Sequence, residues 1–380
     1  FSCARKRQVG RFVEPYLCIC RLSRSGRGRE FSAMVMIGSA TLPGNRYGSL
    51  NQDYVVRMVE QVHSDKILKL QRWKQLYIGA VMDGHGMLGE DAARAAGRAI
   101  MHSLKGCTEL HGRPLGEQST QSLERIIEQA FKAGHKGALG VATHAPMLYD
   151  YPRGSRHQQT YALKTEENGD RIYIDGSACA RILEYGTTAT VVLVQGRHAV
   201  VANVGDSLAV LGTDVGDTYG GEVVCQRHYV ADPDERARLM AEAGDRVACD
   251  GEDGYMMVTH GRLQGFQLAM TRALGHRILT NYGVSHAPTV RRLELDDDHI
   301  CLIVASDGVW EVFSPAEAVR IICDDLAQGK TAGEAALSLI RSAIDVSLAV
   351  TGPSGADNTT AAVFIFDELP RAEDDVGAMG

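Results

Sequence analysis

Three aspartates each stand at one end of an apolar stretch that is typical of a buried β-strand. They are Asp83, Asp307 and Asp357, beside strands expected at 76–82, 300–305 and 359–366. One aspartate in such a place is most often a turn cap, whereas three form an oxygen-rich cluster if the strand ends converge. Because Mg²⁺ and Mn²⁺ prefer carboxylate, carbonyl and water ligands, the pattern predicts a fold whose acidic strand ends meet around divalent cations.

The stretch VMDGHG, residues 81–86, gives the most detail about such a site. Gly84 and Gly86 let the backbone turn tightly around His85 before the next helix. A carboxylate, a backbone carbonyl group and an imidazole thus lie together at the end of one strand. A strand-to-helix turn capped by Asp83 explains the four letters DGHG equally well, so it is the other two aspartates that favour the metal interpretation.

The charge of the chain is distributed unevenly. Of the 380 residues, 23% are charged, and the formal net charge is −7. Residues 1–30 carry eight Lys or Arg and two Glu, a net charge of +6, which leaves −13 for the remaining 350 residues. An acidic body of this kind does not indicate nucleic acid as a partner, and it is compatible with a cation site.

Nine cysteines are scattered along the chain, and the only close pair is Cys18 and Cys20. An odd number without a CxxC pair argues against a zinc site or a disulfide framework and favours a reducing intracellular compartment, cytoplasmic or nuclear. No apolar run approaches the length of a membrane span. The protein is expected to be a monomer. The basic segment 1–30 could be a targeting arm or a partner-contacting tail, but a disordered extension is expected.

The order of patterns predicts one domain at 31–368, followed by a tail at 369–380. Helices are expected at 88–105, 119–137, 232–243, 267–275, 315–327 and 331–348, and further strands at 31–38, 54–59, 186–194, 198–207 and 208–212. Residues 140–185 are the least regular part and are interpreted as an inserted loop with a short hairpin at 171–174. Strands joined by hairpins, with helices in separate blocks, indicate an α+β fold with sheets in the middle and helices outside.

Seven motifs stand in one order along the chain. They are NQD at 51–53, VMDGHG at 81–86, GTTA at 186–189, ANVGDS at 202–207, LAMTRALG at 268–275, ASDGVW at 305–310 and GADNTT at 355–360. Together they resemble the PPM (type 2C) family of metal-dependent protein serine/threonine phosphatases, over about residues 32–367. The resemblance implies a four-layer α-β-β-α sandwich, in which helices flank two central antiparallel sheets and the metals lie at one edge. It also implies phosphoprotein substrates.

The resemblance assigns a role to each residue at the strand ends. Asp83 would bridge two Mg²⁺ or Mn²⁺ ions, and Gly84 would give its carbonyl oxygen to one of them. Asp307 and Asp357 would bind the other ion. A water bridging the metals would attack phosphorus directly, and His85 would protonate the departing serine or threonine oxygen as general acid.

Further residues match the family less closely. Gln52 and Asp53 fit positions that orient metal-bound waters, Asp206 and Glu311 fit positions that help some members hold a weaker third ion, and Arg46 is a weak substitute for a phosphate-binding arginine. Gly48 stands where that arginine usually lies, and His276 stands where Asp is usual. These departures keep a second hypothesis open, that of a weakly active or inactive pseudophosphatase acting as a binding module. A metal-dependent hydrolase of another fold is the third.

One other enzyme class loses support from the sequence. No GxxxxGK(S/T) phosphate loop is present, so a P-loop kinase is not indicated.

Overall fold

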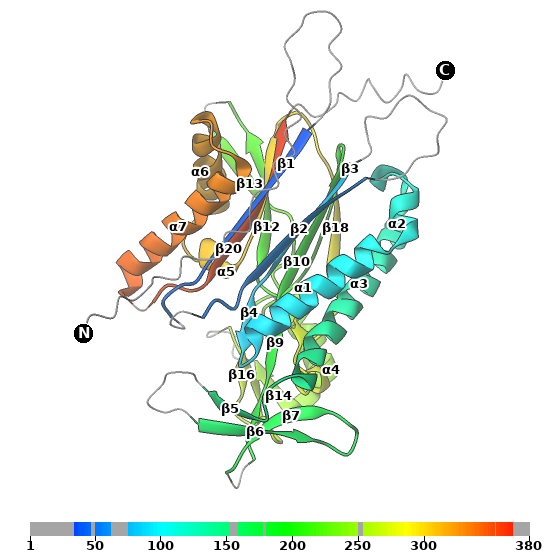
Figure 1. The fold of residues 1–380 in the computed structure, drawn as a ribbon, viewed down its shortest axis with the longest axis vertical. Helices are drawn as coiled ribbons and strands as arrows, with labels where there is room; N and C mark the ends of the chain where they lie inside the picture. Colours follow the sequence, from blue (N-terminus) through cyan, green and yellow to red (C-terminus); the bar gives the residue numbers. More distant parts are fainter. Residues whose placement is uncertain are drawn as a thin grey trace, which may run out of the picture.

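The computed structural model describes residues 34–46, 50–61, 75–151, 159–177, 180–216, 218–249, 254–353 and 355–367. The predicted basic extension at 1–30, the tail at 369–380 and Gly48 lie outside these residues. Two five-stranded antiparallel sheets form the centre of the fold (Figure 1). The predicted α+β class is therefore confirmed.

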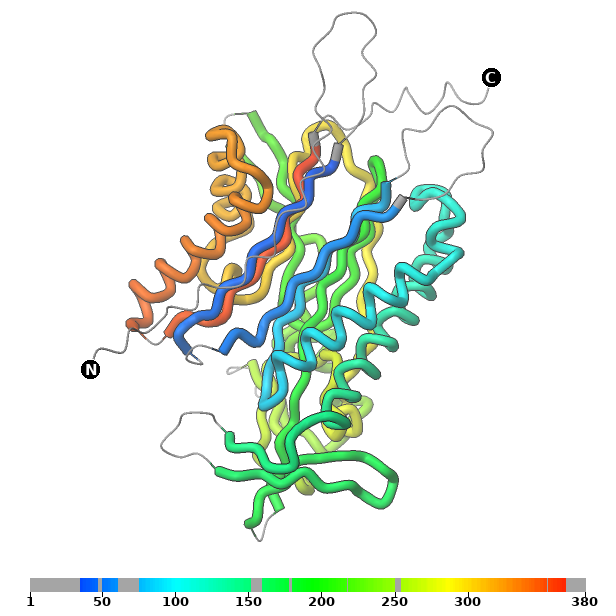
Figure 2. The backbone as a smooth tube through the Cα atoms, in the orientation of Figure 1, coloured from blue at the N-terminus to red at the C-terminus, as the bar shows by residue number. Residues whose placement is uncertain are grey.

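Both sheets combine strands that lie far apart in the sequence. The first sheet has the order β1 (Met34–Leu42), β20 (Thr359–Asp367), β19 (His299–Ala305), β12 (Leu208–Asp214) and β13 (Tyr219–Val223). The second has the order β18 (Thr289–Glu294), β11 (His198–Val204), β10 (Ala189–Gln195), β3 (Gln75–Met82) and β2 (Tyr54–Gln61). The first and last described strands, β1 and β20, are antiparallel neighbours over their whole length (Figure 2).

Alternation along the strands places one apolar core between the sheets and one outside each of them. In β20, Ala362 and Phe364 pack into the core between the sheets, whereas Val363 and Ile365 pack with helices on the other side. That central core, called the seam below, also contains residues of both sheets. They include Val35, Leu302 and Val304 of the first sheet and Val55, Val81 and Val192 of the second.

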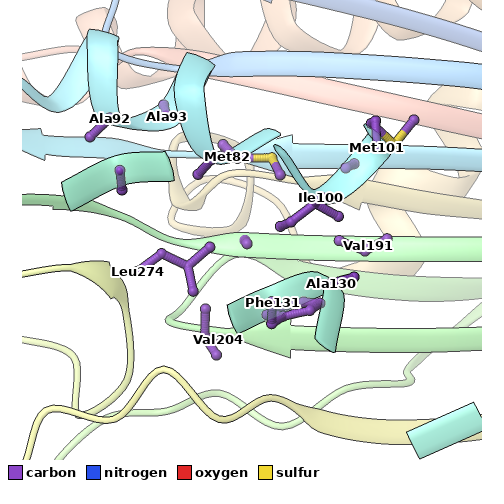
Figure 3. Close-up of a cluster of buried hydrophobic side chains, with 14 of the residues drawn as sticks. Met82, Ala92, Ala93, Ile100, Met101, Ala130, Phe131, Val191, Val204 and Leu274 are labelled. Carbon is purple, nitrogen blue, oxygen red and sulfur yellow. The ribbon is translucent and has the colours of Figure 1, made fainter. Parts of the chain in front are cut away.

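Helix pairs cover the outer faces of the sheets (Figure 1). The helices α1 (Gly89–Lys105) and α3 (Thr120–Gly140) share a buried cluster with the second sheet, in which Ile100 and Phe131 lie near Val191 (Figure 3). On the first sheet, α6 (Pro315–Ala327) and α7 (Ala332–Thr351) each begin with a capping box, built by Ser314 with Glu317 and by Thr331 with Glu334. Among the described residues, none of the helices is long and apolar enough to cross a membrane.

The remaining elements are short. The helices are α2 (Thr108–Gly112), α4 (Pro233–Ala243), α5 (Asp307–Trp310), η1 (Leu115–Glu117), η2 (Val141–Thr143), η3 (Gly244–Arg246) and η4 (Leu279–Tyr282). The strands are β4 (Gly84–Gly86), β9 (Tyr185–Thr187) and β17 (Leu274–Gly275) in one sheet and β14 (Val247–Cys249), β15 (Met256–Val258) and β16 (Gln267–Leu268) in another.

The segment expected to be an inserted loop forms a sheet of its own. Its strands are β5 (Leu148–Tyr151), β6 (Gln159–Thr165), β7 (Arg171–Asp175) and β8 (Ile182–Leu183). Three tyrosines on one face are buried, namely Tyr149, Tyr161 and Tyr173, and the hydroxyl of Tyr149 donates to the carbonyl of Met87 at 2.5 Å. The expected hairpin at 171–174 is thus only one part of a larger structure, because aromatic burial orders a segment whose composition is loop-like.

The helix predicted at 267–275 is wrong. Its two ends pair as strands, Gln267–Leu268 with β15 and Leu274–Gly275 with β9. Between them, Thr271 and Arg272 bond to the buried carboxylate of Glu235. Tertiary pairing therefore overrides the helical tendency of this stretch.

Close packing of α7 on β1 generates a prediction about Gly38. A Cβ atom added there would fall 2.1 Å from the backbone carbon of Ala332, which cannot move away as a side-chain tip would. We expect Gly38→Ala to lower the free energy of unfolding by about 1–3 kcal/mol, measured by urea denaturation. The matched control is Gly333→Ala, because an added Cβ meets no atom within 4 Å there and should be neutral or slightly stabilising. Equal loss in both variants would contradict this account of the packing.

Candidate active site

The antiparallel pairing brings the acidic strand ends together. The end of β19, before Asp307, pairs with the start of β20, after Asp357, since Ala305 lies opposite Ala361. In the same way the start of β2, after Asp53, lies beside the end of β3, before Asp83. The predicted clustering of strand ends is therefore present in each sheet.

A serine hydroxyl links the two halves of this cluster. The hydroxyl of Ser306 donates to Oδ2 of Asp53 at 3.0 Å and accepts from the backbone amide of Thr360 at the same distance. Asp53 directly precedes β2 of the second sheet, whereas Ser306 directly follows β19 and Thr360 lies in β20 of the first. The hydroxyl is buried, so the bond fixes one sheet edge relative to the other.

The GTTA and GDS motifs hold the backbone of Asp83. Its amide donates to Oγ1 of Thr188 at 3.0 Å, and its carbonyl accepts from the amide of Thr188 at 2.8 Å. The hydroxyl of Thr188 is in turn hydrogen-bonded to that of Ser207 at 2.8 Å. These motifs therefore act on the position of Asp83 through its main chain.

Six carboxyl groups lie within one another's electrostatic field. They are Asp53, Asp83, Asp206, Asp307, Asp357 and Glu311. Burial, and then the neighbouring carboxylates, raise the pKa of Asp83 and of Asp307 well above the usual value of 3.8. Burial is also the main cause that raises the pKa of Asp53, to about 7, and of Asp206.

The same cluster contains buried oxygen atoms without hydrogen-bond partners. Among the described residues these include Oδ1 of Asp53, of Asp206 and of Asp307. Repelling carboxylates with unpartnered oxygens are a poor arrangement for a protein alone, and they fit hard divalent cations such as Mg²⁺ or Mn²⁺. Within the described ranges, no three His, Cys, Asp or Glu side chains are grouped closely enough to hold a metal ion by themselves.

Three further residues named by the family resemblance lie next to the acidic residues in space or in sequence, namely Arg46, Gln52 and Gly84. Nη1 of Arg46 donates to Oδ2 of Asp357 at 2.5 Å, and the Arg46 side chain is 46% exposed. The amide of Gln52 donates to the carbonyl of Gly86 at 2.7 Å, so it supports the DGHG turn. Gly84 is tightly enclosed, because a Cβ there would lie 2.2 Å from the carbonyl oxygen of Gly89.

His85 lies on β4, which pairs with β9. Its Nε2 is 2.5 Å from Nε2 of His276, and the two rings are stacked with centroids 4.7 Å apart. Burial, followed by the effect of His276, lowers the pKa of His85 well below 6.5. Burial lowers the pKa of His276 itself to about 3, so the pair is neutral in the metal-free protein.

Glu184 is a buried acid that the sequence analysis did not single out. Its carboxyl oxygens accept from the amides of Ile278 and Leu279, and Oε2 lies 3.7 Å from Nδ1 of His276. Burial raises the pKa of Glu184 to about 7. No motif marks this position, and the only sequence signal was the unusual His276 itself.

Two motifs in the chain have the residue spacing of phosphate-binding loops in other enzymes, but the structure supports neither of them as a phosphate-binding loop. Residues 84–89 read GxGxxG between a strand and a helix, yet β3 pairs antiparallel with both of its neighbours, whereas dinucleotide loops need a parallel βαβ unit. Cys107 and Arg113 have the CxxxxxR spacing of cysteine phosphatases, yet the five residues between them form α2.

Comparison with protein families gives one match, described as Protein phosphatase 2C, over residues 152–349. Among curated proteins, the chain is 30% identical over 195 residues to "Probable protein phosphatase 2C 8" of Arabidopsis thaliana. The aligned region covers 48% of this chain and 50% of that protein. It is 41% identical over 145 residues to "Probable protein phosphatase 2C 48" of Oryza sativa subsp. japonica, covering 36% and 40%. The chain thus spans about half the length, or less, of the curated relatives it matches.

Solved structures show the same fold. A serine-threonine phosphatase 2C from Toxoplasma gondii superposes with a TM-score of 0.58 at 17% identity, covering 87% of this chain and 99% of that one. A serine/threonine phosphatase from S. agalactiae gives 0.51 at 16% identity, covering 88% and 100%. At such identities the likeness concerns the fold alone.

The buried state of Asp53 predicts how the stability of the metal-free protein depends on pH. Its folded pKa of about 7 exceeds the ordinary 3.8, so the folded protein keeps a proton that the unfolded chain releases. The stability from this proton is fully present below about pH 4 and is lost as pH rises through about 7. We expect Asp53→Asn to flatten this decline, measured by urea unfolding in EDTA from pH 4.5 to 8.

The control for that experiment is Asp345→Asn, which changes an exposed aspartate of α7 and should reproduce the wild-type curve. The histidines with lowered pKa oppose the trend in all three proteins, so the difference between wild type and Asp53→Asn reports Asp53 together with its effect on the pKa of Asp83 and of Asp307. Parallel curves for wild type and Asp53→Asn would show that this carboxyl group titrates normally.

Proposed function

Because the chain belongs to the protein phosphatase 2C family, we propose that it is a metal-dependent protein serine/threonine phosphatase. The observation that carries the proposal is the cluster of six carboxyl groups at the converging strand ends, with its unpartnered buried oxygens. The layered cores outside and between the sheets support the finer description of the fold as a four-layer α-β-β-α sandwich. Phosphoproteins are the proposed substrates of a monomeric, intracellular enzyme.

Asp83, the Gly84 carbonyl, Asp307 and Asp357 are proposed to hold two Mg²⁺ or Mn²⁺ ions, and Asp206 with Glu311 a weaker third. When bound, such ions lower the pKa of water and neutralise charge on a phosphoryl group. Asp53, fixed by Ser306, is suited to accept hydrogen bonds from water at the edge of the cluster.

Arg46 is proposed to bind the substrate phosphate. Its guanidinium already reaches the acidic cluster through Asp357 and is exposed enough to meet a ligand from solvent. A guanidinium presents two N–H groups in a plane, which matches the oxygens of a phosphate. Its bond to Asp357 would have to be exchanged or shared when a phosphate arrives.

His85 is proposed to protonate the departing serine or threonine oxygen. An alkoxide leaves poorly, so a positioned proton donor contributes roughly 10²–10⁴-fold to such a step. Burial and His276 disfavour the charged ring of His85 in the substrate-free protein. A phosphate dianion bound nearby acts in the opposite direction, because a neighbouring anion favours the protonated imidazole.

A second candidate function is that of a binding module with little or no activity. The observation that favours it is the engagement of His85 by His276, at a position where the related enzymes usually carry Asp. Both candidates keep the fold and the acidic cluster, so turnover with added metal distinguishes them.

We expect the protein to release phosphate from a phosphothreonine peptide in Mn²⁺ or Mg²⁺ and not in excess EDTA. Asp307→Asn should abolish this turnover while the protein stays folded, because the amide lacks the charge that a divalent cation needs. Removing one of several repelling carboxylates should leave the metal-free stability unchanged or slightly raised, and Mn²⁺ should no longer raise the melting temperature. Phosphate assays and thermal melts on one preparation provide both readouts.

The exposed Asp345→Asn serves again as the control. If Asp307 were only a turn cap, its substitution would cost about 0.5–2 kcal/mol in stability while metal-dependent turnover remained. Full activity in EDTA would refute the metal requirement, and a wild-type protein that is protected by Mn²⁺ without any turnover would favour the binding module.

The role of His85 predicts a dependence on the leaving group. We expect His85→Ala to slow hydrolysis of a phosphothreonine peptide by about 10²–10⁴-fold and that of p-nitrophenyl phosphate much less, because nitrophenolate leaves without a proton. Mn²⁺ should still raise the melting temperature of the variant. Equal losses of hydrolysis rate on both substrates would indicate that His85 has only a structural role in the turn.

A further inference from the structure

Arg227 carries a guanidinium group that the proposed chemistry does not use. We propose that Arg227 is a specificity-determining residue, which binds a carboxylate of the substrate close to the phosphorylated serine or threonine. The preferred substrates would then be phosphoproteins with an aspartate or glutamate near the phosphorylated residue. This inference rests on the proposed function, and it concerns a contact separate from the phosphate contact proposed for Arg46.

The segment that carries Arg227 is tied to the GDS motif. The amide of His228 donates to the carbonyl of Gly205 at 2.9 Å, and Nδ1 of His228 accepts from the amide of Gly205 at 3.2 Å. On the other side, the carbonyl of Gln226 accepts from the side-chain amide of Asn203 at 2.5 Å. Residue 227 is therefore fixed beside this motif by hydrogen bonds of both its chain neighbours.

The guanidinium acts on the acidic cluster without bonding to it. Burial raises the pKa of Asp206, and among the nearby charges Arg227 lowers this pKa whereas Glu311 and Asp357 raise it. Yet Arg227 forms no hydrogen bond or ion pair with any residue that the structure describes. Its charge is thus close to Asp206, while its donors are not taken up by a carboxylate of the protein.

The side chain of Arg227 is anchored, but its end has unused donors. Its Nε is buried without a partner in the described part of the chain, whereas its two terminal nitrogens are not enclosed in this way. The guanidinium carbon lies 5.9 Å from the ring centroid of Tyr229, a side chain that is 36% exposed. Four other described arginines also lack a hydrogen bond or ion pair, but they are exposed, namely Arg98, Arg113, Arg181 and Arg341.

A carboxylate is the ligand that suits this arrangement. Arginine binds carboxylates through two parallel N–H···O bonds, and an anchored side chain loses little freedom when it does so. The carboxyl groups around Asp206 would repel an acidic peptide, so a guanidinium with unused donors among them favours its acceptance. Arg46 bonds to Asp357 instead, and the two arginines can therefore bind different groups of one substrate.

A set of phosphothreonine peptides tests the inference. One glutamate is moved through the positions on either side of the phosphothreonine in a neutral sequence, and each peptide is compared with its glutamine counterpart. We expect glutamate in at least one position to lower the KM of the wild type about fivefold, with little change in kcat. In Arg227→Gln this preference should disappear, because the amide lacks the charge. Any effect of Arg227 on Asp206 or on bound metal is shared by both peptides and cancels in their ratio.

Two further variants separate charge, geometry and position. Arg227→Lys keeps the charge but not the planar pair of donors, and it should retain only part of the preference. The matched control is Arg236→Gln, which changes an exposed arginine of α4 with a 3.4 Å contact to the carbonyl of Cys249 and should keep the whole preference. The KM for p-nitrophenyl phosphate, which has no neighbouring carboxylate, should change little in any variant. Melting temperatures establish that each variant is folded.

A readout without turnover comes from fluorescein-labelled peptides that carry a hydrolysis-resistant phosphonate in place of the phosphothreonine. In Mn²⁺, fluorescence anisotropy should show that the wild type binds the glutamate peptide about fivefold more tightly than the glutamine peptide, and that Arg227→Gln binds both equally. If the wild type releases no phosphate from any peptide, it is the proposed function that fails, and the anisotropy still decides the role of Arg227.

A folded Arg227→Gln variant that keeps the preference for glutamate would overturn the inference, as would a wild type without a preference at any position. An equal rise of KM in Arg227→Gln for the glutamate peptide, the glutamine peptide and p-nitrophenyl phosphate would also overturn it, because the guanidinium would then contact the phosphoryl group itself.

Discussion

The apolar seam between the two sheets confines a set of like charges that would otherwise separate. Valine, leucine and phenylalanine side chains from both sheets fill it, and full burial of each contributes about 1.5–3 kcal/mol. The carboxyl groups at the strand ends oppose this association, because burial first and the neighbouring carboxylates second disfavour their charged forms and raise the pKa of Asp83 and of Asp307. Because burial in the seam outweighs this cost, the fold holds the acidic side chains together, and any affinity of the cluster for cations would depend on the whole fold.

The sequence predicted this part of the molecule well for a simple reason. A strand that ends on an acid can be recognised from local letters alone, and antiparallel pairing then places the start of one strand beside the end of another. Asp83, Asp307 and Asp357 were found in this way, and the family resemblance carried by the seven ordered motifs is confirmed. Their roles as ligands stay predictions, since proximity of carboxylates is a weaker statement than coordination.

What the sequence did not predict depends on contacts between distant segments. The stretch 267–275 has helical composition, but its ends complete two different sheets and its middle bonds to Glu235. The tyrosines of the sheet formed by β5 to β8 are ordered by burial against one another and by Tyr149 reaching Met87. No local sequence pattern marks Glu184, because its position beside His276 arises only when the chain folds.

The absence of a side chain at Gly186 has a consequence for how this site can diverge. The ring of His276 occupies the volume that any larger residue at that position would need. A methyl group at Gly186 would meet both the ring of His276 and, at 2.6 Å, the backbone oxygen of Leu274, so a smaller residue at 276 would remove only one of the two obstacles. The absence of a side chain on β9 is therefore what admits a second imidazole beside His85.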